Sequence, residues 1–221
     1  MKKQEIISTG LGDFSKEKFN ALVEVRAITL SEFREELKSR GYLEVTTSSL
    51  VNIAGSCENP NASFTLNYYG KEAHLSQSAQ IQLEALVMRL NKGFFTVNSS
   101  FREENYNDPE TEGRRLSEFT LIEPERLYEG LQPEKALDNL INEQSSVIKG
   151  VTKKILTNSP SSISILGGDL IYLEKVLGEN FPIITYEEAL SLLSIGNRKY
   201  EFGVDFGIKE EREILRHFNQ V

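Results

Sequence analysis

The chain has 221 residues, of which 39% are apolar and 26% charged, proportions typical of a globular protein with a sizeable core. No apolar run approaches the roughly 20 residues of a membrane-spanning helix, and no signal peptide is recognisable. The net charge of −8 argues against broad non-specific binding to nucleic acid, which needs many cationic contacts to phosphates. Cys57 is the only cysteine, so no intrachain disulfide forms, and we expect a cytoplasmic protein.

Hydrophobic periodicity divides the chain into a helix, a group of strands and a second group of helices. The predicted helices cover residues 15–40, 76–90, 133–156, 169–177, 185–193 and 209–218, and the predicted strands cover residues 42–45, 64–69, 94–103 and 116–125. Segments rich in Asn, Ser, Gly or Pro are predicted as loops or linkers at residues 52–63, 105–113 and 158–162. Grouped strands of this kind predict an α+β fold in which helices flank an antiparallel sheet.

The best candidate site is the hairpin predicted from the two longest strands. Arg102 and Glu104 share one face of the first strand, and Arg114 and Arg115 stand at the far mouth of the connecting loop. An arginine there can clamp a phosphate through two parallel hydrogen bonds, and Glu104 can accept from an exocyclic amine. The hairpin therefore predicts a nucleotide site, with a cross-strand ion pair as an equally weighted alternative.

Other polar residues have plain structural alternatives. Phe119 is by default a core residue, and stacking on a base is the minority outcome. Glu123 and Glu125 share a face, and two buried carboxylates need partners or a cation, whereas exposure would make them unremarkable. The polar run 76–80 is more often a helix cap than a ligand site, and Glu58 alone is only a loop carboxylate.

Several common sites are not expected. The sequence has no phosphate-binding GxxxxGK[ST] loop, no GxGxxG and no GxSxG nucleophile turn. The two histidines, His74 and His217, stand far apart in sequence, so a zinc site is not predicted.

Three segments together resemble the catalytic domain of class II aminoacyl-tRNA synthetases, in the asparaginyl, aspartyl and lysyl group and closest to the asparaginyl branch. Residues 41–45, GYLEV, are similar to the family's first motif, which builds the dimer interface. Residues 69–86 read YGKEAHLSQSAQIQLEAL, where asparaginyl enzymes typically show YFGKEAYLSQSGQLYLEAL. Residues 101–125 are similar to the second motif, FRAE followed by RHLAEF and EPE. The resemblance implies one partial class II catalytic domain over residues 1–221, asparagine, ATP and Mg²⁺ as ligands, and a homodimer.

The resemblance also implies a role for each matching side chain. ATP would be bound by Arg102 at the α-phosphate, Glu104 and Phe119 at adenine, and Arg114 and Arg115 at the loop and γ-phosphate positions. Arg102 would in addition stabilise charge while the amino-acid carboxylate attacks. The amino-acid pocket would include Glu58, Gln80 and Glu84, and Glu123 matches a carboxylate associated with Mg²⁺.

Two neighbouring positions bear on the amino acid that is recognised. Aspartyl enzymes place a lysine where Leu83 stands, and leucine cannot pair with a substrate carboxylate. Asparaginyl enzymes have a glutamate at the position of Glu84, which suits an amide NH₂ group. The resemblance therefore implies asparagine more than aspartate.

The sequence also departs from the family pattern. Ser48 replaces a proline of the first motif, Glu58-Asn59-Pro60 replaces an EGG loop, and Arg115 replaces a histidine. The third motif, with its GxGxxR arginine, is not found in the 221 residues, and we expect an anticodon-binding domain to be missing as well.

Three functions remain open at this stage. The chain activates asparagine with ATP, or it is a non-catalytic synthetase paralogue with a regulatory or assembly role. A ligase that amidates aspartate on the same scaffold is the third. Binding of tRNA is supported neither by the charge of the chain nor by a recognisable anticodon domain.

Overall fold

The computed structural model describes residues 15–55, 60–104, 115–194 and 200–218, which fall into two compact units, Met1–Glu174 and Lys175–Val221. The first unit contains α1 (Lys16–Ser39), β1 (Leu43–Glu44), β2 (Leu50–Val51), a 3₁₀ turn (Pro60–Ala62), β3 (Thr65–Tyr68), β4 (Lys71–Leu75), α2 (Gln80–Leu90), β5 (Phe94–Phe101), β6 (Glu118–Glu125), α3 (Pro133–Asn158) and α4 (Pro160–Ile165). Helix α5 (Leu170–Gly178) spans the division between the units. No described helix combines the length and apolar content needed to cross a lipid bilayer.

The strands form two small sheets. In the first, in the order β1-β5-β6, β1 runs parallel to β5 and β6 antiparallel to it, with Phe94 opposite Glu125 and Phe101 opposite Glu118. In the second, in the order β2-β4-β3, all neighbours are antiparallel. The predicted α+β class is confirmed, and each of the four predicted strands is present, whereas β2 and β4 were not predicted. Strand β4 reads KEAHL, and this mixed composition gives no clear strand pattern.

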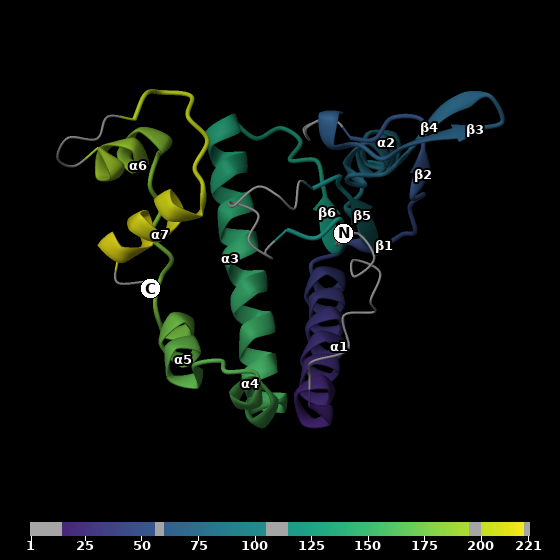
Figure 1. The fold of residues 1–221 in the computed structure, drawn as a ribbon. Helices are drawn as coiled ribbons and strands as arrows, with labels where there is room; N and C mark the ends of the chain where they lie inside the picture. The colour runs from purple at the N-terminus through teal and green to yellow at the C-terminus, as the bar shows by residue number, and fades with distance from the viewer. Residues whose placement is uncertain (1–14, 56–59, 105–114, 195–199, 219–221) are drawn as a thin grey trace, which may run out of the picture. The chain divides into compact units, whose positions relative to one another are not determined.

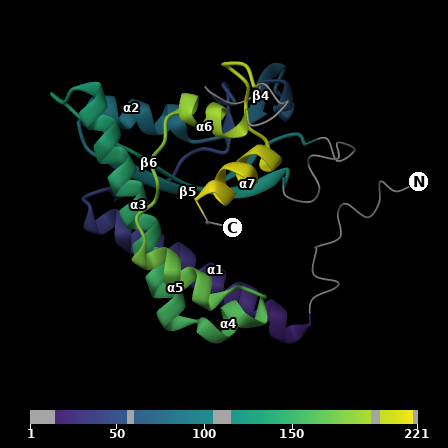
Figure 2. The same ribbon diagram turned by 90° about the vertical axis from the view of Figure 1, so that its left-hand side faces the viewer.

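Helices cover both faces of the β1-β5-β6 sheet. Helix α2 lies on one side of β5 and β6 and α1 on the other, as Figure 2 shows. Alternation along β5 explains this arrangement, because Phe94 packs with Leu83 of α2 while its neighbour Phe95 packs toward α1 and α3. Helices α1 and α3 run beside each other (Figure 1).

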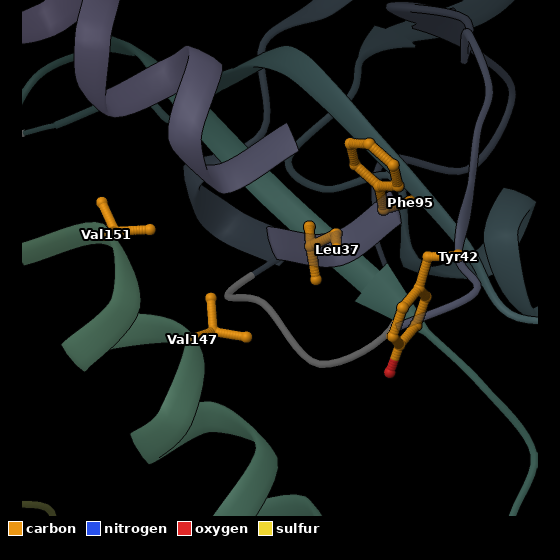
Figure 3. Packing of buried hydrophobic residues seen from close by; sticks show 5 residues of the cluster. All are labelled: Leu37, Tyr42, Phe95, Val147 and Val151. Carbon is orange, nitrogen blue, oxygen red and sulfur yellow. The ribbon is translucent and has the colours of Figure 1, made fainter. Parts of the chain in front are cut away.

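The larger core lies between the sheet and these two helices. Figure 3 shows Leu37 of α1 between two valines of α3 and two aromatic rings. The rings belong to Tyr42, which is 5% exposed, and to Phe95, which is wholly buried. The valines are Val147 and Val151, also buried. This core fixes the strand that carries the candidate site on its opposite face.

The ends of α1 agree with the sequence prediction. The N–H of Lys18 donates to the Ser15 hydroxyl at 3.2 Å, so Ser15 is the N-cap. Gly41, just beyond the helix, has a φ of +85°, a left-handed conformation that a residue with a Cβ rarely adopts.

Two boundary predictions are wrong. Helix α2 begins at Gln80 and not at Ser76, because the Ser76 carbonyl, which would accept from the Gln80 N–H in a helix, accepts instead from the Phe101 N–H at 2.9 Å. The predicted linker 158–162 contains the start of helix α4. There, Pro160 occupies the first turn, where a missing N–H costs nothing.

The second unit contains α6 (Tyr186–Leu193) and α7 (Ile208–His217), which confirm the two last predicted helices. A capping box begins α6, since the Thr185 hydroxyl accepts from the Glu188 N–H at 3.1 Å and the Glu188 carboxylate accepts from the Thr185 N–H at 2.7 Å. The ring of Tyr186 contacts those of Phe202 and Phe206, with centroids 5.1 and 5.2 Å away.

Candidate functional site

One face of the β5–β6 hairpin collects most of the predicted site residues. The register places Ser100 opposite Phe119, Asn98 opposite Leu121 and Thr96 opposite Glu123. Directly opposite residues share a face, so these six side chains project toward the side that α2 covers. The described site is therefore a strip of sheet with α2 along one edge.

Arg102 and Phe119 lie together at the open end of this strip. Arg102 follows β5, and its N–H donates to the carbonyl of Ser117 at 3.0 Å. Its guanidinium carbon lies 5.3 Å from the centroid of the Phe119 ring, within the range of a cation–π contact. Phe119 is partly buried and belongs to neither of the two core clusters of the described residues.

Glu104 forms the ion pair that sequence reasoning offered as an alternative, and its partner is Arg115 across the loop. The two charged groups are 3.8 Å apart, and the side chain of Glu104 is 14% exposed while that of Arg115 is 62% exposed. A pair this exposed on one side contributes little stability. Two further residues of the predicted site, Arg114 and Glu58, lie outside the described residues.

Gln80 and Glu84 lie one turn apart at the start of α2 and contact each other. The side-chain amide of Gln80 donates to the Glu84 carboxylate at 2.9 Å. Leu83, between them in sequence, is wholly buried against Val87 and Phe94. The leucine is therefore a core residue in this structure, and the polar pair, of which Glu84 is exposed, remains beside the strip.

Glu123 is fixed by the backbone at the start of α2. Both of its carboxylate oxygens accept from the N–H of Ala79, at 2.9 and 3.0 Å. Because the first N–H groups of a helix have no partner within it, a carboxylate here is stabilised by both the hydrogen bond and the helix dipole. Neither Glu123 nor Glu125 is exposed, so the exposed alternative is wrong.

Negative charge accumulates beside this contact. Burial raises the pKa of the Glu125 carboxyl above its ordinary value, and the nearby carboxylates of Glu84 and Glu123 raise it further. A cationic group placed among these three carboxylates would relieve their mutual repulsion. The described residues contain no group of three or more His, Cys, Asp or Glu side chains arranged to hold a metal ion.

The structure buries a set of small polar residues, of which the sequence analysis had considered only the run 76–80. Ser100, Thr96 and Gln77 are each no more than 1% exposed, and Ser76 and Ser78 are also buried. The Thr96 hydroxyl lies 3.5 Å from that of Thr47. The sequence signal that could have found them is the polar residue at every second position of β5, at Thr96, Asn98 and Ser100. A half-buried strand normally turns apolar side chains to its covered face, so polar ones there are unusual.

Gln82 ties helix α2 to the segment between β1 and β2. Its side-chain oxygen accepts from the N–H of Ser48 at 2.8 Å, and its amide group donates to the Ser48 carbonyl at 3.0 Å. This two-point contact explains one departure from the family's first motif, since a proline at position 48 has no N–H to donate.

We expect Gln82→Ala to lower the free energy of unfolding by about 1–2 kcal/mol, because two hydrogen bonds of about 1 kcal/mol each are lost. Ser48→Pro should produce a similar loss, whereas Ser48→Ala keeps both backbone groups and should change little. Urea denaturation of the three variants measures the effect. Equal stability of Ser48→Pro and Ser48→Ala would contradict it.

Comparison with known proteins agrees with this geometry. A family model described as "tRNA synthetases class II (D, K and N)" matches residues 3–217. The asparagine–tRNA ligase of Pyrococcus abyssi is 30% identical over 203 residues, covering 92% of this chain and 44% of the relative. That of Microcystis aeruginosa is 27% identical over 215 residues, covering 89% of this chain and 44% of the relative. The chain thus spans less than half the length of these relatives.

Solved structures show the same relationship. The asparaginyl-tRNA synthetase of Pyrococcus horikoshii complexed with asparaginyl-adenylate superposes with a TM-score of 0.78 at 29% identity, over 91% of this chain and 43% of that one. The enzyme of Entamoeba histolytica, 19% identical with a TM-score of 0.67, shares the fold. With a family model matching nearly its whole length, the chain belongs to the class II tRNA synthetases of the D, K and N group.

Proposed function

We propose that this chain provides the part of an asparaginyl-tRNA synthetase-like site that binds ATP and asparagine and supports formation of asparaginyl-adenylate. The observation that carries the proposal is the shared face of the β5–β6 hairpin, where Arg102, Phe119 and Glu123 lie along one strip beside α2. The similarity to a synthetase solved with asparaginyl-adenylate supports it.

The nucleotide would occupy the open end of the strip. Phe119 offers a ring face for adenine, and the partly buried carboxylate of Glu104 can accept from its amino group. Arg102 would hold the α-phosphate through charge-assisted hydrogen bonds, and Arg114 and Arg115 would contact the outer phosphates. The 5.3 Å contact between Arg102 and Phe119 keeps the phosphate and base groups side by side.

The amino acid would bind nearer α2. Glu84 carries a carboxylate that can accept from the NH₂ of an asparagine side chain, and Gln80 already holds this carboxylate in place at 2.9 Å. By the resemblance to the family, Glu58 would also belong to this pocket. A carboxylate repels the negative side chain of aspartate, so the same pair selects asparagine.

The carboxylates of Glu123 and Glu125 fit a Mg²⁺ ion only if bound phosphates supply further oxygen ligands. Mg²⁺ is usually held by one or two carboxylates, substrate phosphates and water, so Glu123 with its neighbour Glu125 suffices without a protein cage. When bound, the ion would neutralise phosphate charge.

In the proposed reaction an oxygen of the asparagine carboxylate attacks the α-phosphorus of ATP. The bond from this phosphorus to the β-phosphate bridge breaks, and pyrophosphate leaves. Arg102 stabilises the charge that develops on the α-phosphate oxygens. The acyl group would then pass to tRNA.

The resemblance of residues 41–45 to the family's first motif supports a homodimer.

Ligand preference tests the proposal directly. We expect the 221-residue chain to bind ATP, and to bind asparagine at least roughly tenfold more tightly than aspartate, a difference of about 1.4 kcal/mol. Calorimetric titration measures both, and asparagine-dependent exchange of pyrophosphate into ATP measures activation.

Other outcomes identify other functions. Tighter binding of aspartate, or exchange that is faster with aspartate, would contradict the proposed pocket. Ligand binding with no exchange would favour the non-catalytic paralogue, and ammonia-dependent formation of asparagine would favour the amidating ligase.

A further inference from the structure

Asn98 carries a buried acceptor that the described protein leaves unused. It lies in the middle of β5, and its Oδ1 is shielded from solvent with no hydrogen-bond partner among the described residues. A buried polar atom that is left without a partner destabilises the fold, so buried acceptors are normally paired. A ligand donor is one way to meet this requirement.

The orientation of the amide follows from its neighbours. Its Nδ2 lies 3.4 Å from the carbonyl oxygen of Ser99 and 3.2 Å from the hydroxyl of Ser100. A carbonyl can only accept, so the nitrogen and not the oxygen must face Ser99. The acceptor oxygen therefore points away from both serines.

The position of Asn98 limits what that donor can be. It stands opposite Leu121, and its diagonal neighbours on β6 are Phe119 and Glu123. It thus lies between the ring proposed for adenine and the carboxylate at the start of α2. Glu123 places a carboxylate diagonally across from Asn98, where the N–H of Ala79 holds it at 2.9 Å. A cationic donor is favoured here over a neutral one.

We propose that Asn98 is a specificity-determining residue whose Oδ1 accepts a hydrogen bond from the α-ammonium group of the bound amino acid. This inference rests on the proposed function, because it requires an amino acid in the site. An ammonium group has three N–H donors and needs several acceptors. Asn98 supplies a neutral acceptor beside the negative charge of Glu123. A ligand without the α-amine leaves this acceptor without a donor.

The test compares two compounds that differ only in this group. One is the non-hydrolysable sulfamoyl analogue of asparaginyl-adenylate, and the other is the same compound without its α-amine. We expect Asn98→Leu to weaken binding of the first by about tenfold and to leave binding of the second within a factor of two. Asn98→Asp keeps an acceptor at the same place and should retain the affinity for the first compound.

Ser99→Ala is the matched control, since Ser99 faces the other side of the sheet, and it should change neither affinity. Circular dichroism confirms folding, and Asn98→Ala carries the same expectation should the leucine variant not fold. Equal losses for both compounds, or no loss for either, would overturn the inference while leaving the proposed function intact. Failure of the unaltered chain to bind either compound would overturn both.

Discussion

Replacing Arg102 with alanine is expected to weaken ATP binding by roughly 100-fold while the chain remains folded. The guanidinium can form two parallel, charge-assisted hydrogen bonds to a phosphate, each stronger than a neutral one, and a 100-fold loss corresponds to about 2.8 kcal/mol. Its 5.3 Å contact with Phe119 also orders the ring proposed for adenine. Calorimetric titration of ATP measures the loss, and far-ultraviolet circular dichroism checks the fold.

Two controls separate a specific phosphate contact from general charge. Arg102→Lys keeps the positive charge but not the planar pair of donors, so an intermediate affinity is expected. Arg89 lies in the last turn of α2 and is not among the proposed ligand contacts, so Arg89→Ala should bind ATP normally. Unchanged affinity in Arg102→Ala, or an equal loss in Arg89→Ala, would remove the main support for a nucleotide site on this face.

The hairpin was predictable because its signals are local. Residues 94–101 and 118–125 are rich in residues that favour strands, and polar loop residues separate them. Once the strands pair, alternation alone puts Arg102 and Phe119 on one face. The shared face of the candidate site could therefore be predicted from sequence. The partner of Glu104 could not, because sequence alone does not favour Arg115 over Arg102.

The surroundings of the hairpin depend on contacts between distant segments, and these carry no local signal. Ser76 precedes α2 because its carbonyl accepts from the N–H of Phe101, 25 residues later in the chain. Helix α4 forms where a linker was predicted, and the hydroxyls of Ser159 and Ser162 each donate to the Glu24 carboxylate of α1 at 2.7 Å. Such side chains read as loop residues until their partner is known.

The carboxylates of the site illustrate the same limit. Spacing placed Glu123 and Glu125 on one face, and the resemblance associated the first with Mg²⁺. It did not show that Glu123 would accept from the N–H of Ala79, because the start of α2 was placed four residues too early. Nor did it indicate Asn98, whose unused acceptor becomes visible only once its neighbours are positioned.

Phe95→Ala is expected to lower the free energy of unfolding by about 3–5 kcal/mol. The ring is wholly buried in the cluster of Leu37, Tyr42, Val147 and Val151, so its removal loses apolar burial and leaves a cavity. A domain of this size is stable by only about 5–15 kcal/mol, so the loss takes up much of its stability. Urea denaturation measures it, and Met88→Ala on α2, at a side chain 74% exposed, should cost less than about 0.5 kcal/mol.

The same variant separates the stability of the hairpin from its function. Phe95 points toward α1 and α3, whereas Thr96 and Asn98 point toward the proposed ligand, so the folded fraction should bind the adenylate analogue with unaltered affinity. Because a ligand that binds only the folded state adds stability by mass action, the analogue at 100 times its Kd should restore about 2.7 kcal/mol. A loss below about 1 kcal/mol would contradict the role of this ring as the centre of the core. A weaker intrinsic affinity would instead show that packing behind β5 sets the position of the residues in front of it.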